Sequence, residues 1–277
     1  MSRLDRRALF TSGAAAALLA ATGVSLNAAP KTGGTLRLAV PREGDMLAIL
    51  ARGAVFDTLT EIAPDGTLRG ELATGWQTDA EARLWQFELR DGVQFHDGTN
   101  LTAEDVLSTL RASGISLRHA DITGPFALLL ELEESRPDLP LVLAQDSFGI
   151  CPRDKLDMPF SEIVGAGCYQ VERAREGRHF RARRVAEHYR ADRAGWANVV
   201  EIAVIPDPSV RAEALRDGFV DVAVLPEPEG LIGRGKYRYH PSERDMTLAV
   251  ASSVGLPGRI GGAALDGGRL AERWWML

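Results

Sequence analysis

The adjacent residues His96 and Asp97 are the first feature of this 277-residue chain that could take part in chemistry. A histidine beside an aspartate has the groups needed for acid–base catalysis. Asp97 is followed by Gly98, however, and Asp-Gly is a frequent turn pair because both residues tolerate a positive φ. We therefore expect His96 and Asp97 to shape a turn rather than a catalytic site.

Cys151 and Cys168, the two cysteines of the chain, offer three alternatives. A nucleophilic thiolate would need a base, but nothing marks His179 or His188 as that base. A structural zinc site would need a second cysteine pair or a spaced histidine pair, and neither accompanies them. A disulfide requires Cα atoms within about 7 Å, which the sequence does not show. We predict no metal, no cofactor and no catalytic cysteine, and we leave a bond between Cys151 and Cys168 open.

Residues 230–236, with the sequence GLIGRGK, match the spacing of a phosphate-binding loop up to its last position. Tyr237 stands where a serine or threonine should hold magnesium, and the residues after it do not have a helical pattern. The chain has no nucleophile elbow and no helix with metal-spaced histidines. We predict that the chain is not an enzyme. Its net charge of -6 also argues against a nucleic-acid surface, which needs a basic face.

Residues 1–29 have the layout of an export signal: a basic start, an apolar middle and small residues near a cleavage site. The apolar run at 13–24 is shorter than the roughly 20 residues that span a bilayer. The Arg6-Arg7 pair before it predicts the twin-arginine route, and an ordinary secretion signal is the alternative. We expect a soluble protein outside the cytoplasm, in the periplasm.

A hairpin and a capped helix are predicted in the middle of the first half. Residues 84–89 alternate apolar and polar side chains, which is the period of a half-buried strand. Asp91-Gly92 then predicts a tight hairpin with a return strand at 93–95. Thr102 and Asp105 predict the first turn of a helix, with threonine as N-cap and an acidic group three residues later.

Other segments predict an α/β arrangement. Residues 35–40 form a β-prone run, and residues 47–59 have a helix-like pattern. Residues 199–205 predict a strand, Asp207 with Pro208 the start of a helix that ends near Gly218, and residues 220–225 the next strand. Strand, helix and strand imply a right-handed parallel crossover. Ligands of such sheets bind beyond the carboxyl ends of the strands.

Residues 85–98 (WQFELRDGVQFHDG) and 101–106 (LTAEDV) closely resemble solute-binding family 5, the extracytoplasmic dipeptide-, oligopeptide- and nickel-binding receptors of ABC importers. Four further segments agree with the family's motifs in order, and together they extend the resemblance over residues 33–225: 71–76, 128–143, 165–169 and 200–222. The resemblance identifies the hairpin and helix as scaffold, with Trp85, Phe87 and Phe95 in the core.

The resemblance implies an α/β fold: a periplasmic-binding-protein type II-like lobe, with a mixed sheet, flanking helices and a hairpin-containing subdomain. Residues 30–225 would form the family's first lobe. Residues 226–277 are too few for a second lobe of usual size, so we expect a short C-terminal closure in its place. Met246 to Val250 would add a strand that completes the sheet.

The resemblance also implies a set of ligand-binding positions, because the family's cleft is lined by the loop after the first strand, by the segment before an acidic turn and by a glycine-rich region. The corresponding residues here are Arg42, Glu43, Asp45, Phe56, Asp57, Gly165, Cys168 and Tyr169. Arg42 and Asp45 could meet the two ends of a zwitterionic peptide, or could be solvated loop residues. Cys168 replaces the family's proline, which leaves that contact open.

The implied function is the binding component of an ABC-type importer, with a peptide or other small solute as ligand. A permease would be its partner, or a second copy of the chain could supply the other wall of the cleft. The alternative is a single-lobe interaction or regulatory module that has lost transport. In that case Trp274 and Trp275 could dock on a partner, whereas they could otherwise fold back on the core.

Overall fold

A computed structural model describes residues 32–227, 230–231, 236–242, 246–257 and 265–274. The predicted export signal, most of the 230–236 glycine-rich segment and Trp275 lie outside these residues. Tyr237 begins a strand rather than the helix that a phosphate-binding loop needs. In the described ranges, no helix has both the length and the apolar character needed to cross a membrane.

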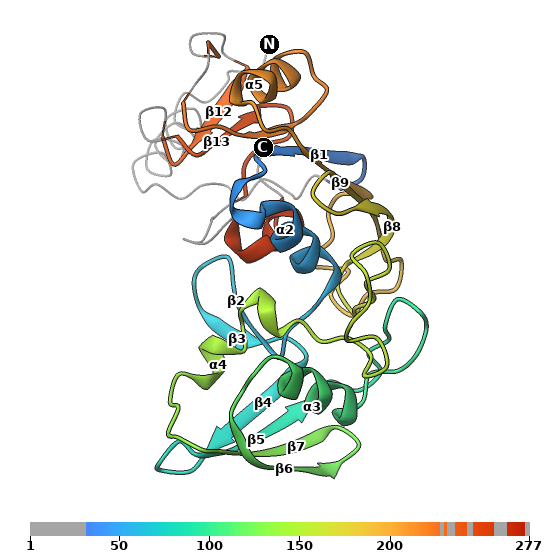
Figure 1. Ribbon diagram of the computed structural model, residues 1–277, viewed down its shortest axis with the longest axis vertical. Coiled ribbons are helices and arrows are strands. Elements are labelled where there is room, and N and C mark those ends of the chain that lie inside the picture. Colours follow the sequence, from blue (N-terminus) through green and yellow to red (C-terminus); the bar gives the residue numbers. More distant parts are fainter. Residues whose placement is uncertain (1–31, 228–229, 232–235, 243–245, 258–264, 275–277) are drawn as a thin grey trace, which may run out of the picture.

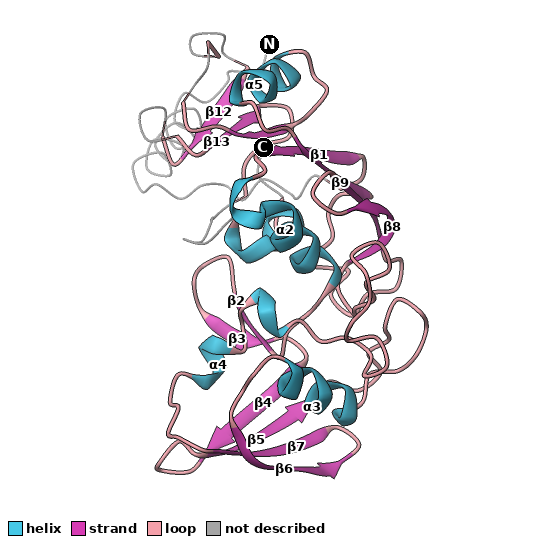
Figure 2. Ribbon diagram, viewed as in Figure 1, coloured by secondary structure: helices cyan, strands magenta, loops and turns pink. Residues whose placement is uncertain are grey.

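The main body is built on a mixed sheet, which has seven strands within the described ranges (Figures 1 and 2). Its strands follow the order β12 (Tyr237–His240), β13 (Leu248–Ala251), β11 (Val222–Val224), β1 (Thr35–Val40), β10 (Val199–Val204), β9 (His179–Arg184) and β8 (Tyr169–Arg175). The central strand β1 pairs in parallel with both β10 and β11, and the remaining pairs are antiparallel. The predicted α/β fold with a mixed sheet and flanking helices is confirmed.

Helices cover the two faces of this sheet around β1. Leu36, Leu38 and Val40 alternate along the strand and pack in one core with α2 (Met46–Val55). Ala39 points to the opposite face, into a smaller cluster with Leu215 of α5 (Pro208–Arg216). The helix predicted at 47–59 therefore exists but ends at Val55. The predicted start of α5 is also confirmed, because the Asp207 carboxylate accepts a hydrogen bond from Ser209 N at 2.8 Å.

A second core lies beneath a sheet at the other end of the molecule, with four strands among the described residues (Figure 1). Its strands follow the order β4 (Ala73–Thr78), β5 (Leu84–Leu89), β7 (Ala127–Leu132) and β6 (Leu117–Gly124), and α3 (Ala103–Ala112) packs against it. The predicted core residues Trp85, Phe87 and Phe95 are all buried there. The remaining described elements are short: β2 (Thr60–Ile62), β3 (Leu68–Gly70), α4 (Leu139–Val142) and the 3-10 helices η1 (Glu43–Asp45), η2 (Asp146–Phe148) and η3 (Asp266–Ala271).

The predicted hairpin between 84–89 and 93–95 is wrong. β5 spans residues 84–89 as expected, but its two edges pair with β4 and β7, so no edge is left for a return strand. Residues 93–95 instead pair with 99–101: Phe95 N donates to Thr99 O at 2.8 Å, and Leu101 N donates to Val93 O at 2.9 Å. The second Asp-Gly pair, Asp97-Gly98, is therefore the one that turns a hairpin.

Turn and cap roles predicted beside this hairpin are confirmed. The Asp97 carboxylate accepts from the backbone N–H of Thr99 at 2.9 Å, which fixes the turn. At the start of α3, Thr102 N donates to Asp105 Oδ2 at 2.9 Å in a capping box. The same carboxylate accepts from Arg153 N at 3.0 Å, which ties the helix start to a distant loop.

The described residues after 236 belong to the main body. β13 pairs with β11, so the predicted completion of the sheet by residues near 246–250 is confirmed, and β12 adds an edge strand that was not predicted. Farther on, η3 packs against α2. Trp274 is only 3% exposed and its Nε1 donates to Val254 O at 3.3 Å. Trp274 thus folds back on the core, and the docking alternative is wrong for this residue.

Two glycines allow η3 to approach α2 closely. A Cβ on Gly53 would lie 2.3 Å from the carbonyl carbon of Gly268. Helical positions usually favour alanine over glycine by about 1 kcal/mol. We predict that Gly53→Ala nevertheless lowers the free energy of unfolding by about 1–3 kcal/mol, because the methyl group overpacks this contact.

Chemical denaturation would measure this change. Gly75→Ala is a suitable control, since a Cβ there meets its nearest atom at 3.9 Å and Gly75 has no positive φ. Equal stabilities of the Gly53→Ala variant and the unmodified chain would contradict the close packing of η3 on α2.

Candidate functional site

A cavity of about 290 Å³ opens where the parallel strands β1 and β10 end. It is lined by Pro41 and Arg42, which follow β1, by Val204 at the end of β10, and by Asp45 at the start of α2. The carboxyl ends of neighbouring parallel strands are the usual ligand position in open α/β sheets. The location agrees with the expectation drawn from the strand–helix–strand pattern.

A second cavity of about 420 Å³ continues along the same helix. The two cavities share Ala48 and Phe160, and the second is also lined by Arg52 and Phe56. We call the two together the α2 groove. It combines aromatic side chains with charged groups of both signs, which is the composition of a site for a polar organic solute.

Arg42 and Asp45 enter the groove from a sharply bent loop. Gly44 has φ 76° and Asp45 has φ 48°, so two consecutive residues adopt the left-handed conformation before α2 begins. Neither Arg42 nor Asp45 has an ion-pair partner among the described residues. Both charges are therefore available to a bound molecule, and Glu176 adds a second carboxylate to the same cavity.

Only some of the predicted ligand-binding residues lie at the α2 groove. Arg42, Asp45 and Phe56 line the α2 groove, and Glu43 is exposed in η1 beside it. The other four residues are buried behind it: Asp57, Gly165, Cys168 and Tyr169.

Gly165 and Tyr169 have structural contacts. A Cβ on Gly165 would lie 2.2 Å from Val55 O, so the glycine allows the chain to pass against the end of α2. The Tyr169 hydroxyl donates to Ala197 O at 3.2 Å and lies 3.4 Å from Ala271 O. Gly165 thus lies against the end of α2, and Tyr169 connects β8 to the segments that contain Ala197 and Ala271.

Asp57 and Cys168 flank a buried imidazole. The Cys168 Sγ atom lies 3.5 Å from His188 Nδ1, and His188 Nε2 lies 3.2 Å from Asp57 Oδ2. Thiol, imidazole and carboxylate follow one another as in a cysteine nucleophile, but Nδ1 already accepts from Arg190 N at 3.1 Å. Burial raises the pKa of the Cys168 thiol well above its usual value, so the thiolate is disfavoured. Cys151 and Cys168 are both free thiols, and the disulfide left open from the sequence is not formed.

Asp57 also belongs to a buried ionic network that the sequence did not predict. We use this name for seven residues: Asp57, Glu61, Glu71, Arg190, Arg269, Glu272 and Arg273. Arg269 is held by Glu71 through both nitrogens, at 2.5 Å and 2.6 Å, and donates to Thr58 Oγ1 at 3.1 Å. Arg190 contacts Glu71 and lies 3.1 Å from Glu61, which Arg273 approaches at 3.5 Å.

Burial and the neighbouring charges together shift the carboxyl pKa values of the network in opposite directions. Burial would raise the pKa of Asp57, but a hydrogen bond from His188 and the charges of His188 and the arginines hold it well below its usual value. Burial raises the pKa of Glu71, and it raises that of Glu272 to about 7, although the Arg269 charge opposes both shifts. Glu272 Oε1 has no hydrogen-bond partner in the described chain, which is consistent with its poor charge compensation.

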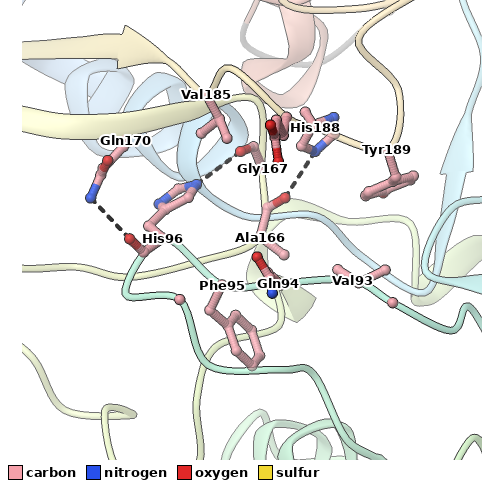
Figure 3. Close-up of a pocket in the computed structure, with 13 residues that line it drawn as sticks. Val93, Gln94, Phe95, His96, Ala166, Gly167, Gln170, Val185, His188 and Tyr189 are labelled. Carbon is pink, nitrogen blue, oxygen red and sulfur yellow. Dashed lines mark hydrogen bonds between the residues drawn. The ribbon is translucent and has the colours of Figure 1, made fainter.

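A separate cavity of about 460 Å³ lies between the two bodies, and we call it the waist cavity (Figure 3). Its walls are the hairpin segment 92–98, residues 166–167 and 170, and the loop 185–189. His96, expected to be a turn residue, lines it and donates from Nε2 to Gly167 O at 2.8 Å. The described residues hold no group of acidic, cysteine or histidine side chains that could bind a metal ion.

The profile of "Bacterial extracellular solute-binding proteins, family 5 Middle" matches residues 67–236. The match covers more than half of the chain. The chain belongs to solute-binding family 5. The family assignment made from residues 85–98 and 101–106 is therefore confirmed.

Solved structures share this fold. The family 5 chain resembles the peptide-binding DppA of Helicobacter pylori, in complex with peptide STSA, with a TM-score of 0.63 and 19% identity, over 70% of this chain and 47% of that one. It resembles AppA of Bacillus subtilis, in complex with a nonapeptide, with a TM-score of 0.65 and 18% identity, over 76% of this chain and 48% of that one. It also resembles AgaA of A. tumefaciens R10, in complex with agropinic acid, with a TM-score of 0.62 and 23% identity, over 69% of this chain and 43% of that one.

Curated relatives of this family 5 chain include the HTH-type transcriptional regulator SgrR of Salmonella typhimurium, 35% identical over 127 residues. SgrR of Escherichia coli K12 is 36% identical over the same length. Each match covers 43% of this chain and 23% of the relative. The chain thus spans about a quarter of the curated relatives it matches and less than half of the solved structures.

Removal of one charge from the buried ionic network should be costly. We predict that Arg269→Ala lowers the free energy of unfolding by about 3–5 kcal/mol, because Glu71 would stay buried with an incompletely compensated charge. Arg118→Ala is the matched control, since that arginine is 58% exposed at the surface and pairs weakly with Glu131. Denaturant unfolding of both variants tests this, and similar stabilities would contradict a structural role for Arg269.

The raised pKa of Glu272 predicts a pH dependence. A carboxyl whose pKa rises on folding, from 4.5 to about 7, favours the folded state fully below 4.5 and loses that contribution as the pH rises through about 7. We expect the unmodified chain to lose more thermal stability than Glu272→Gln between about pH 5 and about pH 8. Thermal melts at the two pH values measure this, and parallel losses in both proteins would refute the assignment.

Proposed function

We propose that this chain binds a small zwitterionic solute, in particular a short peptide, in the α2 groove. One observation carries the proposal: Arg42 and Asp45 bring opposite, unpaired charges to the groove at the carboxyl ends of β1 and β10. Arg42 would take the carboxylate of the solute, and Asp45 its ammonium group. Phe56 and Phe160 would contact the apolar part of the solute.

We further propose that the chain serves as the extracytoplasmic binding component of an ABC-type importer, after export to the periplasm by the twin-arginine route. Membership of family 5 supports the binding role, and the basic and apolar pattern of residues 1–29 supports export. Complexes of DppA and AppA with peptides support the solute class. The protonated, buried Cys168 supports a function without catalysis.

A regulatory module is the second candidate. Its support is the identity of 35% with the transcriptional regulator SgrR over 127 residues. In this case the chain would bind its solute in order to change a protein contact, and no permease would be needed. The two candidates share the solute and differ in the partner protein.

Native mass spectrometry of the processed protein, with and without a pool of di- and oligopeptides, would test binding and oligomeric state together. A retained peptide would support the solute-binding proposal, and a peptide-bound dimer would indicate that a second copy supplies the other wall. A protein that stays empty in the pool would refute peptide binding. If a peptide is retained, recovery of a complex with a permease from membranes would support the importer over the regulatory module.

Substitutions in the groove give a sharper prediction. We expect Arg42→Ala and Asp45→Ala each to weaken the affinity for a retained peptide by about tenfold or more, because each removes a charge-assisted hydrogen bond. Isothermal titration calorimetry measures this. Arg118→Ala, on the sheet at the opposite end of the molecule, is the control and should bind normally. Unchanged affinity in both groove variants would disprove the assignment of Arg42 and Asp45.

A further inference from the structure

The two cavities of the α2 groove differ in their charged side chains. We call the cavity of about 290 Å³ at the strand ends the first compartment and the cavity of about 420 Å³ the second compartment. The charged residues of the first compartment are Arg42, Asp45 and Glu176, which are one cation and two carboxylates. Ala48 lines both compartments and therefore marks their junction.

One face of α2 leads from the first compartment into the second. Arg52 follows Ala48 by four residues, so the two side chains lie on the same face of the helix, about 6 Å apart along its axis. Asp45, at the N-terminal end of the helix, lies about 10 Å from Arg52 on the same measure. An extended peptide covers about 3.3 Å with each residue. A peptide whose ammonium group contacts Asp45 can therefore reach Arg52 with the side chain of its second or third residue.

Arg52 carries a positive charge that no described carboxylate neutralises. Its Nη2 atom donates to Asp146 O at 3.3 Å, and its Cζ atom lies 5.9 Å from the centroid of the Phe56 ring. Arg52 makes no ion pair within the described chain. A backbone carbonyl and an aromatic ring position the guanidinium but leave other N–H groups for a carboxylate, which a guanidinium binds through two parallel hydrogen bonds.

Two further charged side chains line the second compartment, those of Lys155 and Asp157. Lys155 forms an ion pair with Asp97, so its charge is balanced. Asp157 is exposed to solvent, whereas Arg52 is partly buried. Solvent and salt screen an exposed charge more strongly than a partly buried one. Arg52 therefore sets the charge preference of this compartment, and Asp157 weakens that preference.

We propose that Arg52 makes the α2 groove selective for peptides with an acidic side chain at the second or third residue. The carboxylate of that side chain accepts hydrogen bonds from the Arg52 guanidinium, and its methylene groups contact the apolar side chains of the second compartment, which include Phe56 and Met158. This inference rests on the proposed function, because Asp45 must hold the amino terminus of the peptide.

Isothermal titration calorimetry of the full chain with matched peptide pairs tests the selectivity. Ala-Glu is compared with Ala-Gln, and Ala-Ala-Glu with Ala-Ala-Gln, because the two members of each pair have nearly the same size and differ in one charge. We expect the acidic peptide of at least one pair to bind about tenfold more tightly, because it gains a charge-assisted hydrogen bond to Arg52.

Variants assign the selectivity to Arg52. Arg52→Gln should reduce the affinity ratio within the selective pair to about one, Arg52→Lys should retain part of the ratio, and Asp157→Asn should increase it. Arg118→Gln changes a 58% exposed arginine on the sheet at the opposite end of the molecule, and this matched control should keep the ratio. Thermal melts check that the variants fold.

The outcomes separate this inference from the proposed function. Equal affinities within both pairs, together with weaker binding by Arg42→Ala and Asp45→Ala, would overturn the selectivity and support the proposed function. Absence of binding by all four peptides would overturn both. Selectivity that persists in Arg52→Gln would place the acidic side chain elsewhere and overturn the role of Arg52.

Discussion

Burial of charge is the constraint on which the rest of this structure depends. Four carboxyl groups of the network, on Asp57, Glu61, Glu71 and Glu272, lie within a few ångströms of three guanidinium groups, on Arg190, Arg269 and Arg273. Such groups are costly to bury unless each finds a partner. Every segment that contributes one of them is thereby fixed relative to the others. Burial raises the pKa of Glu272 toward neutrality, and Arg269, which is already held by Glu71, offsets this shift only in part.

The network lies where the two main cores meet, and this placement explains the shape of the binding surface. One core packs α2 against the seven-stranded sheet, and the other packs α3 against the four-stranded sheet. Asp57 follows the end of α2, and its carboxylate accepts from the Tyr189 hydroxyl at 2.6 Å. Tyr189 and His188 in turn line the waist cavity. The α2 groove and the waist cavity are therefore both lined by residues that adjoin or contact Asp57 of the network: Phe56 in the first, His188 and Tyr189 in the second.

Sequence reasoning succeeded where the decisive interactions are local or where a long family motif was present. The cap of α3 needs only Thr102 and Asp105, and the alternation in residues 84–89 states which side chains of β5 are buried. The hairpin failed because the partners of β5 come from β4 and β7, and pattern rules assign a strand to its nearest neighbour. Asp97-Gly98 and Asp91-Gly92 are equal turn signals in the sequence. The pairing of residues 93–95 with 99–101 makes Asp97-Gly98 the hairpin turn.

The buried ionic network could not have been assembled from the sequence, because its members are far apart along the chain. A weak signal was nevertheless present: Asp57 directly follows the apolar residues 54–56, and Arg273 precedes a buried tryptophan. Charged residues in such positions are either exposed by a turn or buried with partners. Of the predicted ligand positions, Arg42 and Asp45 near the end of β1 and Phe56 at the end of α2 line the groove, whereas four others are buried: Asp57, Gly165, Cys168 and Tyr169.

The parallel pairing of β1 with both β10 and β11 has a consequence for the order of assembly. The strand that lies at the centre of the sheet is made early in synthesis, yet both of its neighbours are made more than 150 residues later. η3, which completes the core against α2, follows later still. Contacts between such distant segments make folding slow, since long loops must close before any pairing is gained. The pairing of β1 must therefore wait until residues 222–224 have been made, and the face of α2 that η3 covers stays exposed until residues 266–271 are available.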